Sequence, residues 1–152
     1  MEFEFLRPED KPALLGLSNP EFLTAAQSAL AELGYKVHSP DSHEDFLTRF
    51  TQVPYQVVVL EDCFQCNSPE ENTALRSLQV MPMPLRRHTT IVLIGAAFGT
   101  LNAMQAFQHS VHAVASPLDL SSLAGIIQKA VSDSTAFMNV YFETQRQMNA
   151  TK

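Results

Sequence analysis

The sequence predicts one α/β domain built around a parallel β-sheet. Two observations carry this prediction. Short apolar runs of strand length alternate with amphipathic stretches of helix length along most of the chain. The strongest run, at residues 55–60, contains three consecutive valines, and a β-branched run of this kind is typical of a strand covered by helices on both faces.

The elements follow in a regular order. The first apolar run, residues 13–17, is followed by Asn19, which predicts a helix N-cap, and by Pro20, which suits a first helical residue. That helix places apolar residues three and four apart and ends at Gly34. The other predicted strands are residues 35–39, 55–60, 89–94 and 111–115, and the other predicted helices are residues 42–52, 69–78, about 100–107 and 119–130.

This order predicts a doubly wound, flavodoxin-like sheet of five parallel strands in the order 2-1-3-4-5. We expect an N-terminal segment at residues 1–11, the domain at 12–131 and a helical extension at 132–152. Functional residues of such sheets lie beyond the carboxyl ends of the strands. The candidate positions are therefore Leu17, Ser18, Asn19, Glu61, Asp62, Gly95 and Ser116.

Charge and composition argue against some classes of binding partner and location. The net charge of -6 argues against nucleic-acid and anionic-membrane binding, and we expect the compact basic cluster at residues 86–88 to be a solvated loop. We likewise expect His38 and His88 to face water. No apolar run approaches the ~18 residues of a membrane span, and Glu2 and Glu4 stand where a signal peptide needs basic residues. We therefore expect a cytoplasmic protein whose two cysteines are free thiols.

Three segments carry a resemblance to a known family. They are residues 32–35 (Glu-Leu-Gly-Tyr) after the first helix, residues 55–61 as the third strand, and residues 116–120 (Ser-Pro-Leu-Asp-Leu) after the fifth. With them, residues 12–131 resemble the receiver domain of response regulators in two-component signalling. The resemblance implies an acidic pair that binds Mg²⁺, a phosphoaccepting aspartate, a hydroxyl residue and a lysine, each following a different strand.

The matching positions of this chain hold other residues. Leu17 and Ser18 replace the acidic pair, Glu61 the aspartate, Gly95 the hydroxyl residue and Ser116 the lysine. The resemblance therefore implies a degenerate pseudo-receiver that is not an enzyme and needs no cofactor. Phosphorylation of Glu61 or of its neighbour Asp62 remains a weaker alternative.

We expect such a domain to work by binding protein, as a phosphorylation-independent module of bacterial signalling or regulation. The partner would be another protein or a second copy, since a homodimer is a natural form. The extension carries an apolar stripe that either packs on its own domain or forms an interaction surface. Its members are Phe137, Val140, Tyr141 and Met148.

The segment Cys63-Phe64-Gln65-Cys66 is a CxxC motif and supports an alternative function. A small-molecule or metal sensor could use the cleft at Glu61, Asp62, Cys63 and Cys66. A zinc site needs two further ligands that the sequence does not place nearby, and a redox site needs the first cysteine at a helix start. We expect ordinary loop packing here, with a shared metal or redox chemistry as alternatives.

Overall fold

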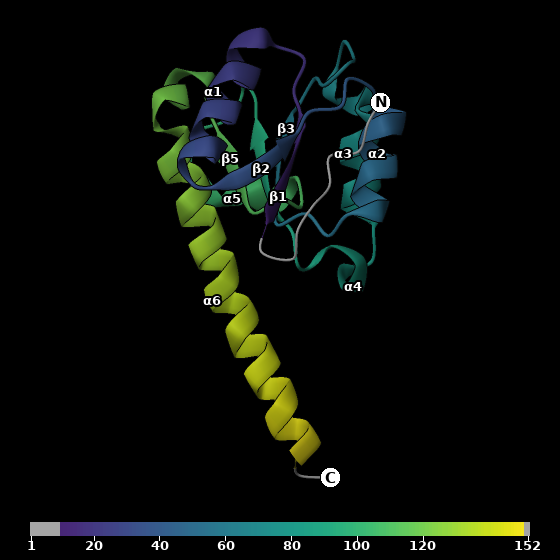
Figure 1. The fold of residues 1–152 in the computed structure, drawn as a ribbon, viewed down its shortest axis with the longest axis vertical. Helices are drawn as coiled ribbons and strands as arrows, with labels where there is room; N and C mark the ends of the chain where they lie inside the picture. The colour runs from purple at the N-terminus through teal and green to yellow at the C-terminus, as the bar shows by residue number, and fades with distance from the viewer. Residues whose placement is uncertain (1–9, 151–152) are drawn as a thin grey trace.

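The computed structural model describes residues 10–150, and within them the strands form one parallel sheet. The sheet order is β2-β1-β3-β4-β5, which confirms the predicted flavodoxin-like topology (Figure 1). The first strand starts two residues earlier than predicted, and the third starts two residues later. The strands are β1 (Lys11–Gly16), β2 (Tyr35–His38), β3 (Val57–Glu61), β4 (Thr90–Ile94) and β5 (Ala113–Ala115).

Helices cover both faces of the sheet. The α-helices are α1 (Pro20–Glu32), α2 (His43–Gln52), α3 (Thr73–Val80), α4 (Met83–Arg86), α5 (Ala103–Gln108) and α6 (Leu123–Ala150), with 3₁₀ turns η1 (Pro69–Glu71) and η2 (Pro117–Ser122). One apolar cluster joins one face of the sheet to α1 and α6, and a second joins the other face to α2, α3 and α5. Because alternate strand residues enter opposite clusters, the valines of β3 are buried on both sides, as their run predicts.

Side-chain caps determine where several helices begin. The Oδ1 atom of Asn19 accepts a hydrogen bond from the Glu21 N–H, as predicted. The prediction of a helix over residues 69–78 is wrong at its start, because residues 69–71 form only a 3₁₀ turn. The α-helix begins at Thr73, after Asn72, whose backbone is non-helical and whose side chain accepts from the Leu75 N–H.

Two predictions of solvent exposure are wrong. His38 is only 5% exposed, and its Nδ1 lies 2.7 Å from the hydroxyl of Tyr55. In the basic cluster Arg86 is also buried, and its guanidinium donates to the carbonyl oxygens of Leu78 and Ser110. These partners are distant in sequence, so the burial follows from the fold. His88 is exposed, as predicted.

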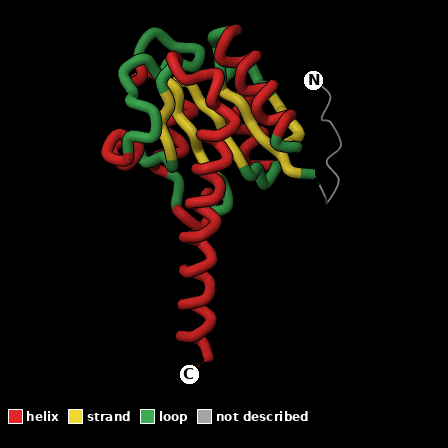
Figure 2. Tube along the Cα trace, turned by 90° about the vertical axis from the view of Figure 1, so that its left-hand side faces the viewer, coloured by secondary structure: helices red, strands yellow, loops and turns green. Residues whose placement is uncertain are grey.

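The last helix is longer than the domain needs. Instead of two separate pieces, residues 123–150 form one continuous helix that packs on the sheet at its start and then projects away from the domain (Figures 1 and 2). Every residue from Asn139 to Ala150 is exposed. Within residues 10–150, no helix combines the length and apolar character that crossing a membrane requires.

Candidate functional site

The ends of four strands form one edge of the sheet, here called the carboxyl edge. Gly16 pairs with Leu60, and Ile94 pairs with both Glu61 and Ala115, so β1, β3, β4 and β5 end close together. The residues at and just after the ends of these strands are therefore neighbours in space, as the sequence predicted. They are Leu17, Ser18, Glu61, Asp62, Gly95 and Ser116.

Glu61 bonds directly to the loop between β1 and α1. Its Oε1 atom accepts hydrogen bonds from the backbone N–H groups of Ser18, at 2.9 Å, and Asn19, at 3.0 Å. Both N–H groups lie at the start of α1, where the exposed amides and the helix dipole favour a negative charge. The carboxylate therefore links two loops that are distant in sequence.

The positions of the acidic pair do not supply ligands for a metal. Leu17 is only 6% exposed and belongs to the apolar core. The Ser18 hydroxyl accepts a hydrogen bond from the Gln65 N–H at 2.6 Å, which further fastens the loop after β3 to the loop after β1. Mg²⁺ prefers several oxygen ligands, carboxylates among them, in near-octahedral geometry. Residues 17 and 18 do not fit the magnesium that the family resemblance implies.

Asp62 fills the space beside Gly95. A Cβ atom at position 95 would lie 2.5 Å from Oδ2 of Asp62 and 2.8 Å from the ring of Phe98. Removal from water raises the pKa of the Asp62 carboxyl, and the nearby charge of Glu61 adds to this effect, while a hydrogen bond from the Cys63 N–H opposes it. A hydroxyl side chain at position 95 has no room while Asp62 stays in place.

Ser116 serves as a cap. Its hydroxyl accepts a hydrogen bond from the Leu118 N–H at 3.2 Å, at the start of η2. Its own N–H donates to Thr100 Oγ1, which in turn donates to Asp119 at 2.5 Å. Position 116 therefore organises the β5–η2 turn and provides no positive charge to the edge.

Asn72 is a residue of this region that the sequence analysis missed. It is fully buried, and its Nδ2 donates to the carbonyl oxygens of Glu61, at 2.9 Å, and Asp62, at 3.1 Å. Its Oδ1 at the same time caps α3. An asparagine before an apolar helix is a signal for the cap, but the contacts with β3 depend on the tertiary fold.

The two cysteines line a shallow hollow of about 520 Å³ together with Ser18, His43, Gln65, Asn67 and Glu71. Loss of hydration and the neighbouring Asp62 carboxyl raise the pKa of Cys63 to about 11, and loss of hydration also raises that of Cys66. The Cys66 thiol lies 3.1 Å from the Ser68 carbonyl oxygen. Within residues 10–150, no three His, Cys, Asp or Glu side chains are placed to hold a metal ion together.

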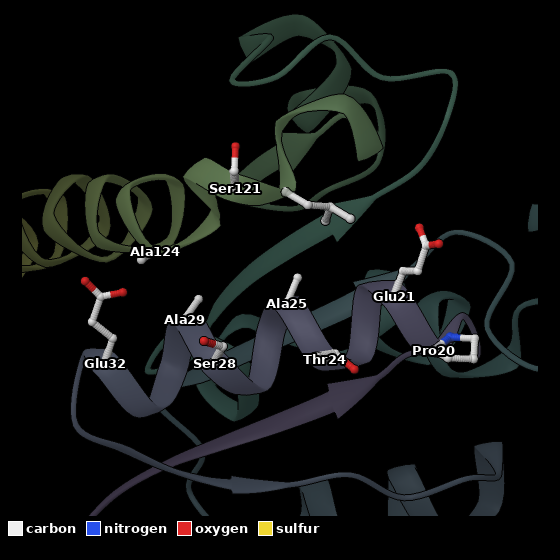
Figure 3. Close-up of a pocket in the computed structure, with 10 residues that line it drawn as sticks. Pro20, Glu21, Thr24, Ala25, Ser28, Ala29, Glu32, Ser121 and Ala124 are labelled. Carbon is white, nitrogen blue, oxygen red and sulfur yellow. The ribbon is translucent and has the colours of Figure 1, made fainter.

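A larger open groove, of about 640 Å³, lies between α1 and the start of α6 (Figure 3). Small side chains such as Ala25, Ala29 and Ala124 line it, and Glu21 and Glu32 lie near its two ends. The groove lies on the α1 side of the domain and includes none of the strand-end positions of the carboxyl edge.

The predicted stripe on the extension is exposed, and with the likewise exposed Thr144 we call it the outer stripe: Phe137, Val140, Tyr141, Thr144 and Met148. Phe137 is 70% exposed, and Val140 and Met148 are each 65% exposed. Phe137 lines a hollow with Met83, Arg87 and His112 of the domain, and Tyr141 contacts Arg87 directly. The Arg87 guanidinium lies 5.6 Å from the centre of the Tyr141 ring, and Arg87 Nη1 donates to the Tyr141 hydroxyl at 3.3 Å.

No protein-family model and no curated protein sequence matches this chain. Solved structures do match. A response regulator receiver domain protein from Methanospirillum hungatei is 13% identical with a TM-score of 0.64, over 84% of this chain and 98% of that one. The receiver domain of a sensor histidine kinase from Pseudomonas aeruginosa, solved with magnesium in its active-site cleft, is 18% identical with a TM-score of 0.61, over 81% and 98%.

A structure described as adenylate cyclase from Rhodopirellula baltica is 12% identical with a TM-score of 0.65, over 90% of this chain and 98% of that one. At these identities the likeness concerns the fold. The chain has the fold of a response regulator receiver domain, with a long C-terminal helix added.

Proposed function

We propose that this chain is a receiver-like module of bacterial signalling or regulation that binds protein and is not phosphorylated. The observation that carries the proposal is the pair of hydrogen bonds from the Ser18 and Asn19 backbone to the Glu61 carboxylate. In this chain a direct contact between protein groups joins position 61 to the loop where the family resemblance implies an acidic pair that binds Mg²⁺.

Phosphoryl transfer to a carboxylate depends on cations and fixed donors that stabilise the charge on the transferred group. Leu17 lies in the core, Gly95 has no side chain, and the hydroxyl of Ser116 is engaged by the Leu118 N–H. Asp62, which follows Glu61, packs against Gly95. These contacts favour a single, fixed arrangement of the residues at the carboxyl edge and argue against a change of that arrangement on phosphorylation.

The outer stripe supports a binding role. An apolar stripe on a projecting helix exposes surface that water solvates poorly, and exposed apolar surface of this kind marks interaction sites. Phe137, Val140 and Met148 are exposed along one face of α6, away from the carboxyl edge. The proposal therefore assigns binding to α6. It includes no catalytic step, and it assumes a protein of the cytoplasm.

Two measurements test the proposal. Amide NMR spectra with Mg²⁺ and beryllofluoride, a phosphoryl mimic, should leave the signals of Ser18, Glu61 and Gly95 unchanged. Saturable shifts at these residues would show that the edge accepts a phosphoryl group. In parallel, the full chain should capture a protein from cells of the source organism, and a chain ending at Val131 should not.

The sensor alternative, which used Glu61, Asp62, Cys63 and Cys66, gains no specific support. Metal binding and redox chemistry both use the thiolate, and the surroundings raise the pKa of both thiols. We therefore do not propose it.

A further inference from the structure

The face of α6 that packs on the domain continues beyond the domain. Leu123, Ile127 and Ala130 are buried against the sheet, at alternating spacings of four and three residues. The same spacing then continues along the projecting part of the helix, at Ser134, Phe137, Tyr141, Thr144 and Met148. An alternation of four and three residues keeps side chains on one face and is the pattern with which two helices pack along their length.

Apart from the contacts of Arg87 with Tyr141 and Phe142, the projecting part receives little support from the domain. From Asn139 onward every residue is exposed, so the domain contributes little burial there. Several residues in this part have modest helix propensity, among them Asn139, Val140 and Thr144. A helical segment of this length is marginal in water on its own, and the usual source of stability is packing of its apolar face. Packing of the exposed side chains of the outer stripe against another surface would supply that stability.

The charges on the helix indicate which surface fits. Glu143 and Arg146 lie on other faces of α6, and the outer stripe contains no charged residue. Asp133, near the beginning of the projecting part, is paired with Lys129 at 2.9 Å within the same helix. Two copies of the stripe can face each other without like-charge repulsion, and nothing in the stripe selects a charged partner.

We propose that the outer stripe binds a second copy of this chain, so that two α6 helices form a two-stranded coiled coil. This inference rests on the proposed role of α6 in binding. Residues 134–150 span about 25 Å of helix, which is between two and three heptads. Arg87 lies beside Tyr141 and Phe142 and leaves Phe137, Val140 and Met148 exposed for the second helix.

Sedimentation equilibrium of the full chain tests the inference. The wild-type mass should rise with concentration and level off at twice the mass of one chain. Phe137→Glu and Met148→Glu each place a carboxylate in the stripe and should raise the dimer dissociation constant at least about tenfold. Asn139→Glu is the matched control, because Asn139 is exposed on the opposite side of the helix and should leave the constant unchanged.

A wild-type chain that stays monomeric at the highest concentration overturns the inference, and so does a limiting mass of three or more chains. If Phe137→Glu and Asn139→Glu raise the dimer dissociation constant equally, the inference is also overturned, because the stripe would then have no special role. If the monomeric chain still captures another protein that truncation at Val131 loses, the proposed function holds and only the second copy is wrong. If it captures nothing, both proposals fail.

Discussion

The carboxyl group of Asp62 lies so close to the backbone of Gly95 that a Cβ atom there would come within 2.5 Å of its Oδ2 and 2.7 Å of its Cγ. The two residues are thus complementary in shape: the missing side chain of one makes room for the carboxyl of the other. Position 95 is where the family resemblance implies a hydroxyl residue, and this contact leaves no room for such a side chain while Asp62 stays in place.

Replacing Gly95 by serine should destabilise the fold. The new Cβ cannot be accommodated unless Asp62 or Phe98 moves, and overpacking of this kind costs about 1–3 kcal/mol. We expect a lower midpoint in urea unfolding with an unchanged slope.

The control is Gly125→Ser, because a Cβ at Gly125 meets nothing within 4 Å and serine has the better helix propensity. It should be neutral or slightly stabilising. Adding Asp62→Ala to Gly95→Ser should recover at least half of the loss. If the two changes prove additive, the close contact does not determine the choice of glycine.

The contact between Glu61 and the start of α1 should contribute measurably to stability. Glu61→Ala leaves the N–H groups of Ser18 and Asn19 without their acceptor, and hydrogen bonds to a charged group are worth about 1.5–3 kcal/mol. Glu61→Gln keeps an oxygen acceptor and should cost about half as much. Urea unfolding measures the loss of stability, and hydrogen exchange should be faster at both amides.

The control is Glu143→Ala, which removes a carboxylate from an exposed position of α6 and should change stability by less than about 0.5 kcal/mol. A similar loss of stability in both alanine variants would contradict this role of Glu61.

The sequence determined the architecture more fully than the contacts of the site. The run of valines in β3 and the cap at Asn19 are signals that lie within a few consecutive residues. The structure confirms the predictions made from both: the valines are buried, and Asn19 caps α1. The position of Glu61 at the end of a strand was also predicted. Its bonds to Ser18 and Asn19 were not, because they join loops more than forty residues apart.

The same reason explains the errors at His38 and Arg86. A polar side chain is expected at the surface unless it has a buried partner. The partners here, the Tyr55 hydroxyl and the Ser110 carbonyl, are brought close only when the chain folds. Sequence patterns therefore predict which face an element buries more readily than which polar group finds a distant partner.

Cys63 should react slowly in the folded protein. With its pKa raised from about 9 to about 11, the thiolate fraction at a pH below both values falls about a hundredfold, and alkylation slows accordingly. Iodoacetamide labelling of Cys66→Ser, followed by mass spectrometry, isolates this thiol. The same variant in urea provides the control, since unfolding restores the ordinary pKa. Folded protein that reacts as fast as unfolded protein would show that Asp62 and the surrounding loop do not suppress the thiolate.

The contact between Arg87 and Tyr141 should hold the projecting part of α6 at a fixed angle to the domain. Arg87→Ala removes the guanidinium that lies 5.6 Å from the ring centres of Tyr141 and Phe142, together with the 3.3 Å hydrogen bond to Tyr141. Because Tyr141 and Phe142 are each 41% exposed and water screens the charge of Arg87, we expect a loss of stability below about 1 kcal/mol. The clearer effect should be local: faster hydrogen exchange over residues 138–150, with the sheet unchanged.

Two variants separate the parts of this contact. Tyr141→Phe keeps the ring under the guanidinium and loses only the hydrogen bond, so it should show a fraction of the Arg87→Ala effect. Arg146→Ala removes the same kind of charge from an exposed position further along α6 and should leave exchange over residues 138–145 unaltered. Exchange that is equally fast in Arg87→Ala and Arg146→Ala would mean that loss of charge, and not loss of the anchor, loosens the helix.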